Sequence, residues 1–234
     1  MGDAVQEDST EDATQEMWTQ VDNYFGCRLV SPDPAFEAVL RANHQAGLPA
    51  IDLTPLQGKF LHLLAHMRGA RRILEVGTLG GYSTLWLARA LPPGGLLVTL
   101  ERNPDHARVA TENLKNAGVL ERISLRLGRA SDSLRALVDA GTEPFDLIFL
   151  DADKAGLPEY LDWSLKLARI GTIILADNVV REGRVLDAAS DDADIQGIRR
   201  FAERLAAEPR LSSTVLQTVG IKGYDGFALA VVVA

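Results

Sequence analysis

The sequence lacks the features expected of secreted, membrane-spanning or nucleic-acid-binding proteins. Its single cysteine, Cys27, excludes an internal disulfide framework and fits a reducing cytosol. It has no run of 18 or more apolar residues, so we expect no membrane span. The segment from Met1 to Asp8 has no signal-peptide pattern of basic and apolar residues. These absences favour a soluble, cytoplasmic protein.

Charge is distributed unevenly along the 234 residues. The chain has 32 Asp and Glu against 24 Lys and Arg, for a formal net charge of −8. Residues 1–16 contain six acidic residues and no Lys or Arg, which leaves a net charge of about −2 for the rest. No basic face that would bind nucleic acid is therefore expected. We expect residues 1–16 to be a disordered acidic tail and residues 17–234 to form a single domain.

Three helices are expected before the first strand. Residues 17–29 have apolar side chains at helical spacing. A second helix starts within residues 31–34 and runs to His44. The third starts at Thr54-Pro55, with Thr as N-cap and Pro in the first helical position, and runs to about Met67.

From Arg72 onward the pattern alternates between strand and helix. The expected strands are 73–76, 96–100, 123–127, 145–150 and 172–176. The helices between them begin near Gly81, Pro104, Ser131 and Leu157. This alternation predicts right-handed crossovers and a parallel, doubly wound α/β sheet. A helix over 191–207 follows, and then strands 211–219 and 227–233 form an antiparallel hairpin through Gly220–Gly226.

Hard oxygen ligands follow two neighbouring strands of this predicted sheet. Asp151 and Asp153 come after the fourth strand, and Asp177 and Asn178 follow the fifth. Polar groups just past parallel strands face the ligand crevice of an open sheet. Two carboxylates and an amide suit a divalent cation such as Mg²⁺, and Lys154 is well placed to handle a proton.

The loop from Glu75 to Ser83 joins the first strand to its helix and is rich in glycine. A dinucleotide fingerprint beginning at Gly77 would need glycines where Leu79 and Tyr82 stand. The next strand ends at Glu101, whose carboxylate can accept hydrogen bonds from both hydroxyls of a ribose. A loop open to a nucleoside, without a phosphate cradle, suggests a ligand such as S-adenosylmethionine (SAM).

Taken in order, the motifs Glu75 to Ser83, Glu101, Asp151-Ala-Asp-Lys154 and Asp177-Asn178 resemble those of the cation-dependent O-methyltransferases of the catechol and caffeoyl-CoA type. The resemblance covers roughly residues 50–234 and weakens back to Trp18. It implies a class I methyltransferase fold: a seven-stranded, mostly parallel sheet with an antiparallel C-terminal strand and extra N-terminal helices. It also implies a homodimer.

The resemblance further implies a set of site residues. The donor-binding residues would be Glu75, Gly77, Leu79, Tyr82, Ser83, Glu101, Arg102, Arg129, Ala130, Asp151 and Asp153. The metal ligands would be Asp151, Asp177 and Asn178, and the catalytic residue Lys154. The adenine would lie at the Gly128–Ala130 turn, where some relatives have a serine in place of Ala130. The cation would be Mg²⁺, with Ca²⁺ and Mn²⁺ as alternatives.

Metal chelation suits a particular acceptor. A phenol, with a pKa of about 10, is mostly protonated at neutral pH. Two adjacent hydroxyls on a cation are both acidified and aligned for attack, so we expect a small hydroxylated aromatic acceptor of the catechol kind.

Other interpretations remain open at the level of sequence. They are a nicotinamide-dependent oxidoreductase, a methyltransferase for nitrogen or a non-catechol hydroxyl, and a catalytically idle interaction protein on the same scaffold. Asp153 could contact the donor or cap the following helix. The roles of two further groups of residues are also undecided. Trp18, Tyr24 and Phe25 could line an acceptor pocket or pack on a dimer partner, and Arg181, Arg184 and Lys222 could meet an anionic acceptor or be exposed charges.

Overall fold

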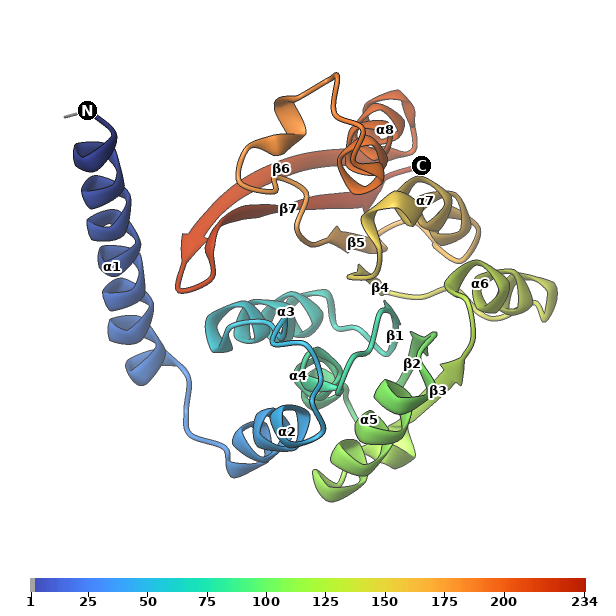
Figure 1. Cartoon of the computed structure of the whole chain (residues 1–234). Helices are drawn as coiled ribbons and strands as arrows, with labels where there is room; N and C mark the ends of the chain where they lie inside the picture. The colour runs from blue at the N-terminus through green and yellow to red at the C-terminus, as the bar shows by residue number, and fades with distance from the viewer. Residues whose placement is uncertain (1–2) are drawn as a thin grey trace.

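The computed structural model describes residues 3–234, with side chains from Asp12 onward, and its centre is one seven-stranded sheet (Figure 1). The strand order is β3-β2-β1-β4-β5-β7-β6. The strands are β1 Arg72–Val76, β2 Leu96–Glu101, β3 Ile123–Leu127, β4 Leu147–Leu150, β5 Ile173–Ala176, β6 Leu211–Gly220 and β7 Gly223–Val232. The first five are parallel, and β7 is antiparallel to both β5 and β6. The predicted fold class is confirmed.

Helices cover both faces of the sheet. One layer consists of α2 Pro34–Gln45, α3 Pro55–Arg68, α4 Tyr82–Ala90 and α5 Pro104–Asn116; the other consists of α6 Ala130–Asp139, α7 Leu157–Lys166 and α8 Ala193–Ala207 (Figure 1). Short 3₁₀ turns lie at η1 Leu120–Arg122, η2 Lys154–Gly156 and η3 Arg184–Leu186. Successive strand residues point to opposite faces, so Ile73 packs in the first layer's core and Leu74 in the second's.

Strand register brings the ends of three central strands level. Val76 of β1 pairs with Leu150 of β4, which in turn pairs with Ala176 of β5. The residues that follow these three therefore emerge side by side at one edge of the sheet. This alignment positions the site described below.

The C-terminal hairpin is tighter than the sequence indicates. Gly220 pairs directly with Gly223, so only Ile221 and Lys222 connect the strands, and β7 begins four residues before the expected position 227. The glycine-rich segment is read as a loop, but Gly226 is a strand residue. A Cβ there would lie 2.5 Å from the carbonyl oxygen of Leu216.

The N-terminal helix is longer than the sequence indicates. Helix α1 spans Asp3–Leu29, so residues 3–16, expected to be disordered, continue the helix, and residues 1–2 lie outside the described part. Neither proline nor glycine interrupts residues 3–25, so no strong helix breaker stops it. The helix runs along one side of the molecule (Figure 1), where Gln15 donates to the Gly220 carbonyl at 3.0 Å. Among the described residues, no helix is both long and apolar enough to cross a lipid bilayer.

Candidate active site

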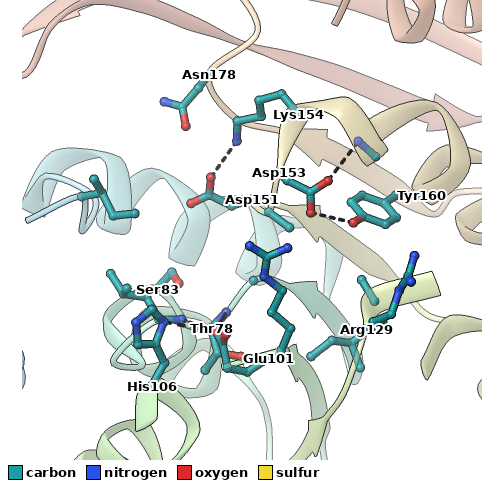
Figure 2. A pocket seen from close by; sticks show the side chains of 18 of the residues that line it. Thr78, Ser83, Glu101, His106, Arg129, Asp151, Asp153, Lys154, Tyr160 and Asn178 are labelled. Atoms are coloured by element: carbon teal, nitrogen blue, oxygen red, sulfur yellow. Dashed lines mark hydrogen bonds and ion pairs between the residues drawn. The ribbon is translucent and has the colours of Figure 1, made fainter. Parts of the chain in front are cut away.

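A cavity of about 760 Å³ opens at the carboxyl ends of β1, β2 and β4. Of the residues predicted from the sequence, it is lined by Gly77, Leu79, Tyr82, Ser83, Glu101, Arg102, Arg129, Ala130, Asp151, Asp153, Lys154 and Asn178. Figure 2 shows most of the polar members pointing into one space. Glu75 and Asp177 do not line it.

The glycine loop is shaped by the carboxylate at the end of β2. Glu101 Oε2 accepts hydrogen bonds from the backbone amides of Thr78 at 3.3 Å and Leu79 at 2.9 Å. Gly77 has φ +102°, and a Cβ there would lie 2.2 Å from the Asp151 carbonyl oxygen, so only glycine fits. The loop therefore gives a ligand close access to the backbone beside Glu101.

Glu75 lies beneath the cavity rather than in it. It is fully buried and accepts hydrogen bonds from three hydroxyls, those of Ser83 at 2.7 Å, Thr84 at 2.5 Å and Thr99 at 2.7 Å. Burial raises the pKa of its carboxyl to about 7, although the three hydroxyls oppose that shift. Its role in this geometry is to orient Ser83, which does line the cavity.

Asp151, Lys154, Asp177 and Asn178 gather where the level strands end. Lys154 Nζ donates to Asp151 Oδ1 at 3.0 Å, and Figure 2 shows Asn178 beside this pair. Burial, and then the charge of Asp151, raises the pKa of Asp177 to about 7. Two neighbouring carboxylates next to a side-chain amide are a donor set that fits a divalent cation.

Other metal-binding arrangements are not evident among the described residues, where no group of three or more His, Cys, Asp or Glu is placed to hold an ion. His62 and His66 stack with ring centroids 6.4 Å apart, and His62 Nδ1 lies 3.3 Å from the Trp86 carbonyl oxygen. This pair therefore has a packing role on α3.

Asp153 caps the 3₁₀ turn after β4 while also lining the cavity. Its Oδ2 accepts from the Gly156 amide at 3.1 Å, and its Oδ1 accepts from the Tyr160 hydroxyl at 2.8 Å (Figure 2). Burial raises the pKa of the Tyr160 phenol further above its usual value, so the phenol remains a donor. Tyr160 lies on α7, nine residues beyond Asp151, and no motif in the sequence points to it.

His106 and Thr78 are two more cavity residues that the sequence patterns do not single out. His106 Nδ1 lies 3.8 Å from Glu101 Oε1. The sequence could have indicated His106, because it lies in the first turn of α5, just past the Asn103 cap, and that turn faces the end of β2.

A second cavity, of about 450 Å³, adjoins the first on the far side of Asn178. Its walls include Phe60, Phe149, Tyr224 and Phe227, and Asp177 faces it. Ile51, Leu53, Asn178 and Arg181 line both cavities. The two carboxylates thus face different chambers, Asp151 the first and Asp177 the second.

The residues left undecided by the sequence are placed as follows. Arg181 and Lys222 line the second cavity, whereas Arg184 pairs with Asp192 away from it. Among the α1 side chains that the structure describes, only Asp22 reaches that cavity, while Tyr24 and Phe25 are exposed to solvent.

The sheet order, the glycine loop and the acid at the end of β2 define a class I SAM-dependent methyltransferase. The family model described as O-methyltransferase matches residues 31–231, and the chain belongs to this family, of the catechol and caffeoyl-CoA type. It is therefore a SAM-dependent O-methyltransferase, and the oxidoreductase alternative is set aside.

Three similar proteins illustrate the relationship. A catechol O-methyltransferase of Niastella koreensis is 49% identical over 93% of this chain and 98% of its own length. An O-methyltransferase from Bacillus cereus, solved in complex with SAH, is 56% identical with a TM-score of 0.92 over 93% of this chain and 99% of that one. TomG from Streptomyces achromogenes, an O-methyltransferase involved in tomaymycin synthesis solved with SAM, is 50% identical with a TM-score of 0.91 over 94% and 99%.

Proposed function

We propose that the enzyme methylates one hydroxyl of a catechol-like acceptor whose two adjacent hydroxyls chelate a divalent cation, Mg²⁺ in the first place. The observation that carries this proposal is the meeting of two cavities at Asp151, Asp177 and Asn178. The name of the Niastella relative, a catechol O-methyltransferase, supports the acceptor class.

The proposed metal ligands are Asp151, Asp177 and Asn178. When bound, the cation would lower the pKa of the acceptor hydroxyl and fix its orientation. The raised pKa of Asp177 supports this assignment, because burial and then the neighbouring charge of Asp151 disfavour its charged form, and the charge of Lys154 does not offset them. The backbone of Asn178 has φ +55°, a conformation rare for residues other than glycine, which turns its amide toward the junction of the cavities.

The first cavity would hold the donor. Glu101 retains acceptor capacity for ribose hydroxyls, the Gly128–Ala130 turn would contact the adenine, and Ser83 lies toward the methionine end. The second cavity would hold the acceptor ring against the aromatic side chains of α3 and β7. The residues of the two cavities would then bring the donor's methyl group and the acceptor's oxygen together at their shared wall.

Lys154 is the proposed proton acceptor. Its side chain is 6% exposed, and Asp151 holds its Nζ in the same cavity wall. In the transfer, the acceptor oxygen bonds to the methyl carbon while the carbon–sulfur bond breaks and leaves its electron pair on sulfur. The hydroxyl proton passes to the neutral amine of Lys154, or it leaves to solvent while a charged Lys154 stabilises the oxygen.

The test is a methyl-transfer assay with SAM, comparing catechol, phenol and 2-aminophenol with and without chelator. We expect catechol to be methylated on oxygen, phenol to be inert, and activity to vanish in EDTA and return with excess Mg²⁺. Equal turnover of phenol, chelator-resistant turnover, or methylation on the nitrogen of 2-aminophenol would each contradict the proposal.

We also propose a homodimer. Helix α1 exposes Met17, Val21, Tyr24, Phe25 and Leu29, and the neighbouring edge strand β6 exposes Val215, Leu216 and Val219. An apolar surface spread over one helix face and one sheet edge is typical of an interface between copies.

A cytoplasmic location is proposed because Cys27 is a free, exposed thiol.

A further inference from the structure

The segment between α2 and α3, residues 46–53, closes one end of the donor cavity; we call it the strap. Ile51, Asp52 and Leu53 line that cavity, and the Gly128–Ser131 turn lines it as well. Asp52 is the strap's only charged side chain there. The sequence patterns do not single it out.

Two buried amides fix the orientation of Asp52. Asn43 Nδ2 donates to Asp52 Oδ1 at 2.9 Å. Asn113 Nδ2 donates both to Asn43 Oδ1 at 3.0 Å and to the Gly80 carbonyl at 2.9 Å. A Cβ on Gly80 would lie 1.8 Å from Asn43 Oδ1, so glycine is needed for this contact. The carboxylate of the strap is thereby tied to the glycine loop of the donor site.

Among the described side chains, none forms a direct ion pair with the carboxylate of Asp52. Lys222, the cation that acts on it, donates its ammonium group instead to the backbone carbonyl of Asp52 at 2.6 Å. Burial raises the pKa of the Asp52 carboxyl despite the hydrogen bond from Asn43. A carboxylate that has lost water without gaining an ion pair is a ready site for a cation.

Each of the other carboxylates that line this cavity accepts at least one hydrogen bond from a protein group at its own end of the cavity. Glu101 accepts from backbone amides on both oxygens, Asp153 accepts from Tyr160 and Gly156, and Asp151 accepts from Lys154. Asp52 is the carboxylate at the strap end of this cavity, and among the described residues only its Oδ1 accepts a hydrogen bond, from Asn43, so its Oδ2 is available to a ligand.

We propose that Asp52 binds the α-ammonium group of the donor's amino-acid end, with Asn43 and Asn113 as its positioning residues. The proposal rests on the donor orientation given above, with adenine at the Gly128–Ala130 turn and ribose at Glu101. That orientation directs the amino-acid end toward the strap. An ammonium group there would replace the water that Asp52 has lost with an ion pair and a charge-assisted hydrogen bond.

The test measures binding without turnover, by isothermal titration calorimetry of the metal-free full chain. The two ligands are SAH and 5′-S-(3-carboxypropyl)-5′-thioadenosine, which is SAH without its α-amino group. Asp52→Asn should raise the Kd for SAH at least tenfold, which is about 1.4 kcal/mol, and leave the Kd for the deaminated analogue within twofold. Asn43→Ala should weaken SAH selectively by a smaller factor.

Glu112→Gln is the matched control, because it also removes one negative charge but lies exposed on α5, where Glu112 pairs with Arg108. It should bind both ligands like the unmodified protein. Equal affinity of Asp52→Asn and the unmodified protein for SAH would overturn the proposal, as would equal losses for both ligands, which would indicate that Asp52 only shapes the cavity.

These outcomes are separable from those of the proposed function. Neither acceptor nor metal enters the titration, so an Asp52-dependent preference for SAH in a protein that does not methylate catechol would contradict the proposed function alone. Catechol methylation with SAH binding insensitive to Asp52→Asn would contradict this inference alone.

Discussion

The side-chain nitrogen of Lys154 lies 3.0 Å from Asp151 Oδ1, and both side chains are mostly withdrawn from water, 6% and 25% exposed. One carboxylate thus serves both the lysine and, in our proposal, the metal. The position of Lys154 therefore depends on Asp151, which is also a proposed metal ligand.

The first prediction concerns Lys154. Lys154→Gln should lower kcat by about 10²-fold or more, the usual contribution of a positioned acid or base, with the KM for SAM nearly unchanged. Lys154→Arg separates the two roles: if it stays as low as the Gln variant, proton transfer dominates, and if it recovers most of kcat, charge dominates. The measurement is steady-state kinetics from pH 6 to 10; full activity of Lys154→Gln at neutral pH would remove the residue from the mechanism.

The second prediction concerns the metal ligands. Asp177→Asn should raise the Mg²⁺ concentration needed for half-maximal activity by at least tenfold, because it removes one of two anionic ligands. SAH binding should be unchanged, since Asp177 faces the second cavity and not the donor cavity. Magnesium titration and calorimetry with SAH check the two halves, and a variant with normal magnesium dependence would refute the assignment.

The third prediction is a pH dependence of stability due to Glu75. Its pKa is about 7 in the folded protein against an ordinary 4.5, so between these values the folded state holds a proton that the unfolded chain has released. The contribution of Glu75 to the free energy of unfolding is therefore complete at pH 4.5 and below. It falls as pH rises from 4.5 to about 7 and levels off above that. Over that interval the loss should approach about 3 kcal/mol.

Glu75→Gln should remove this decline, because glutamine does not ionise. Urea unfolding of the unmodified protein and the variant from pH 4.5 to 8 gives two curves of free energy against pH. They should converge or cross as pH rises, and parallel curves would show that Glu75 does not take up a proton on folding.

The fourth prediction concerns assembly. Replacing Val21 and Phe25 together by Glu should give a monomer in sedimentation velocity, because two charges would be buried in the proposed interface. Asn23→Glu adds charge on the opposite face of α1 and should leave the dimer intact. A monomeric unmodified protein at micromolar concentration would refute the dimer.

Much of the fold could be predicted from the sequence because its elements carry strong local signals. Parallel strands buried on both faces form short apolar runs, and caps such as Asn103 and Thr54 fix where helices start. Asp151 and Asp177 could be placed together because they follow strands that are neighbours in the sheet. The antiparallel hairpin is confirmed, but the start of its second strand differs from the expected one, because glycine at 223 and 226 has the same local signal in a loop as in a tightly packed strand.

The rest of the site depends on contacts that leave no mark on local sequence. Asn43 and Asn113 are 70 residues apart, and nothing near either predicts that they meet at Gly80. Glu75 is expected among the donor-binding residues because it lies two residues before Gly77, but the structure places it beneath the cavity lining. Its strand position, two after Ile73, places it on the α2–α5 face rather than in the cavity, and strand periodicity could have revealed that.

The level ends of β1, β4 and β5 position the reacting groups, whereas other elements form much of the proposed acceptor cavity. Main-chain hydrogen bonds among Val76, Leu150 and Ala176 set where the reacting groups stand, and no side chain on the acceptor side takes part in them. The hairpin turn and α1 can therefore be redesigned residue by residue without moving the chemical centre. Changes of acceptor are therefore best sought in the lining of the second cavity, with β1, β4 and β5 left unchanged.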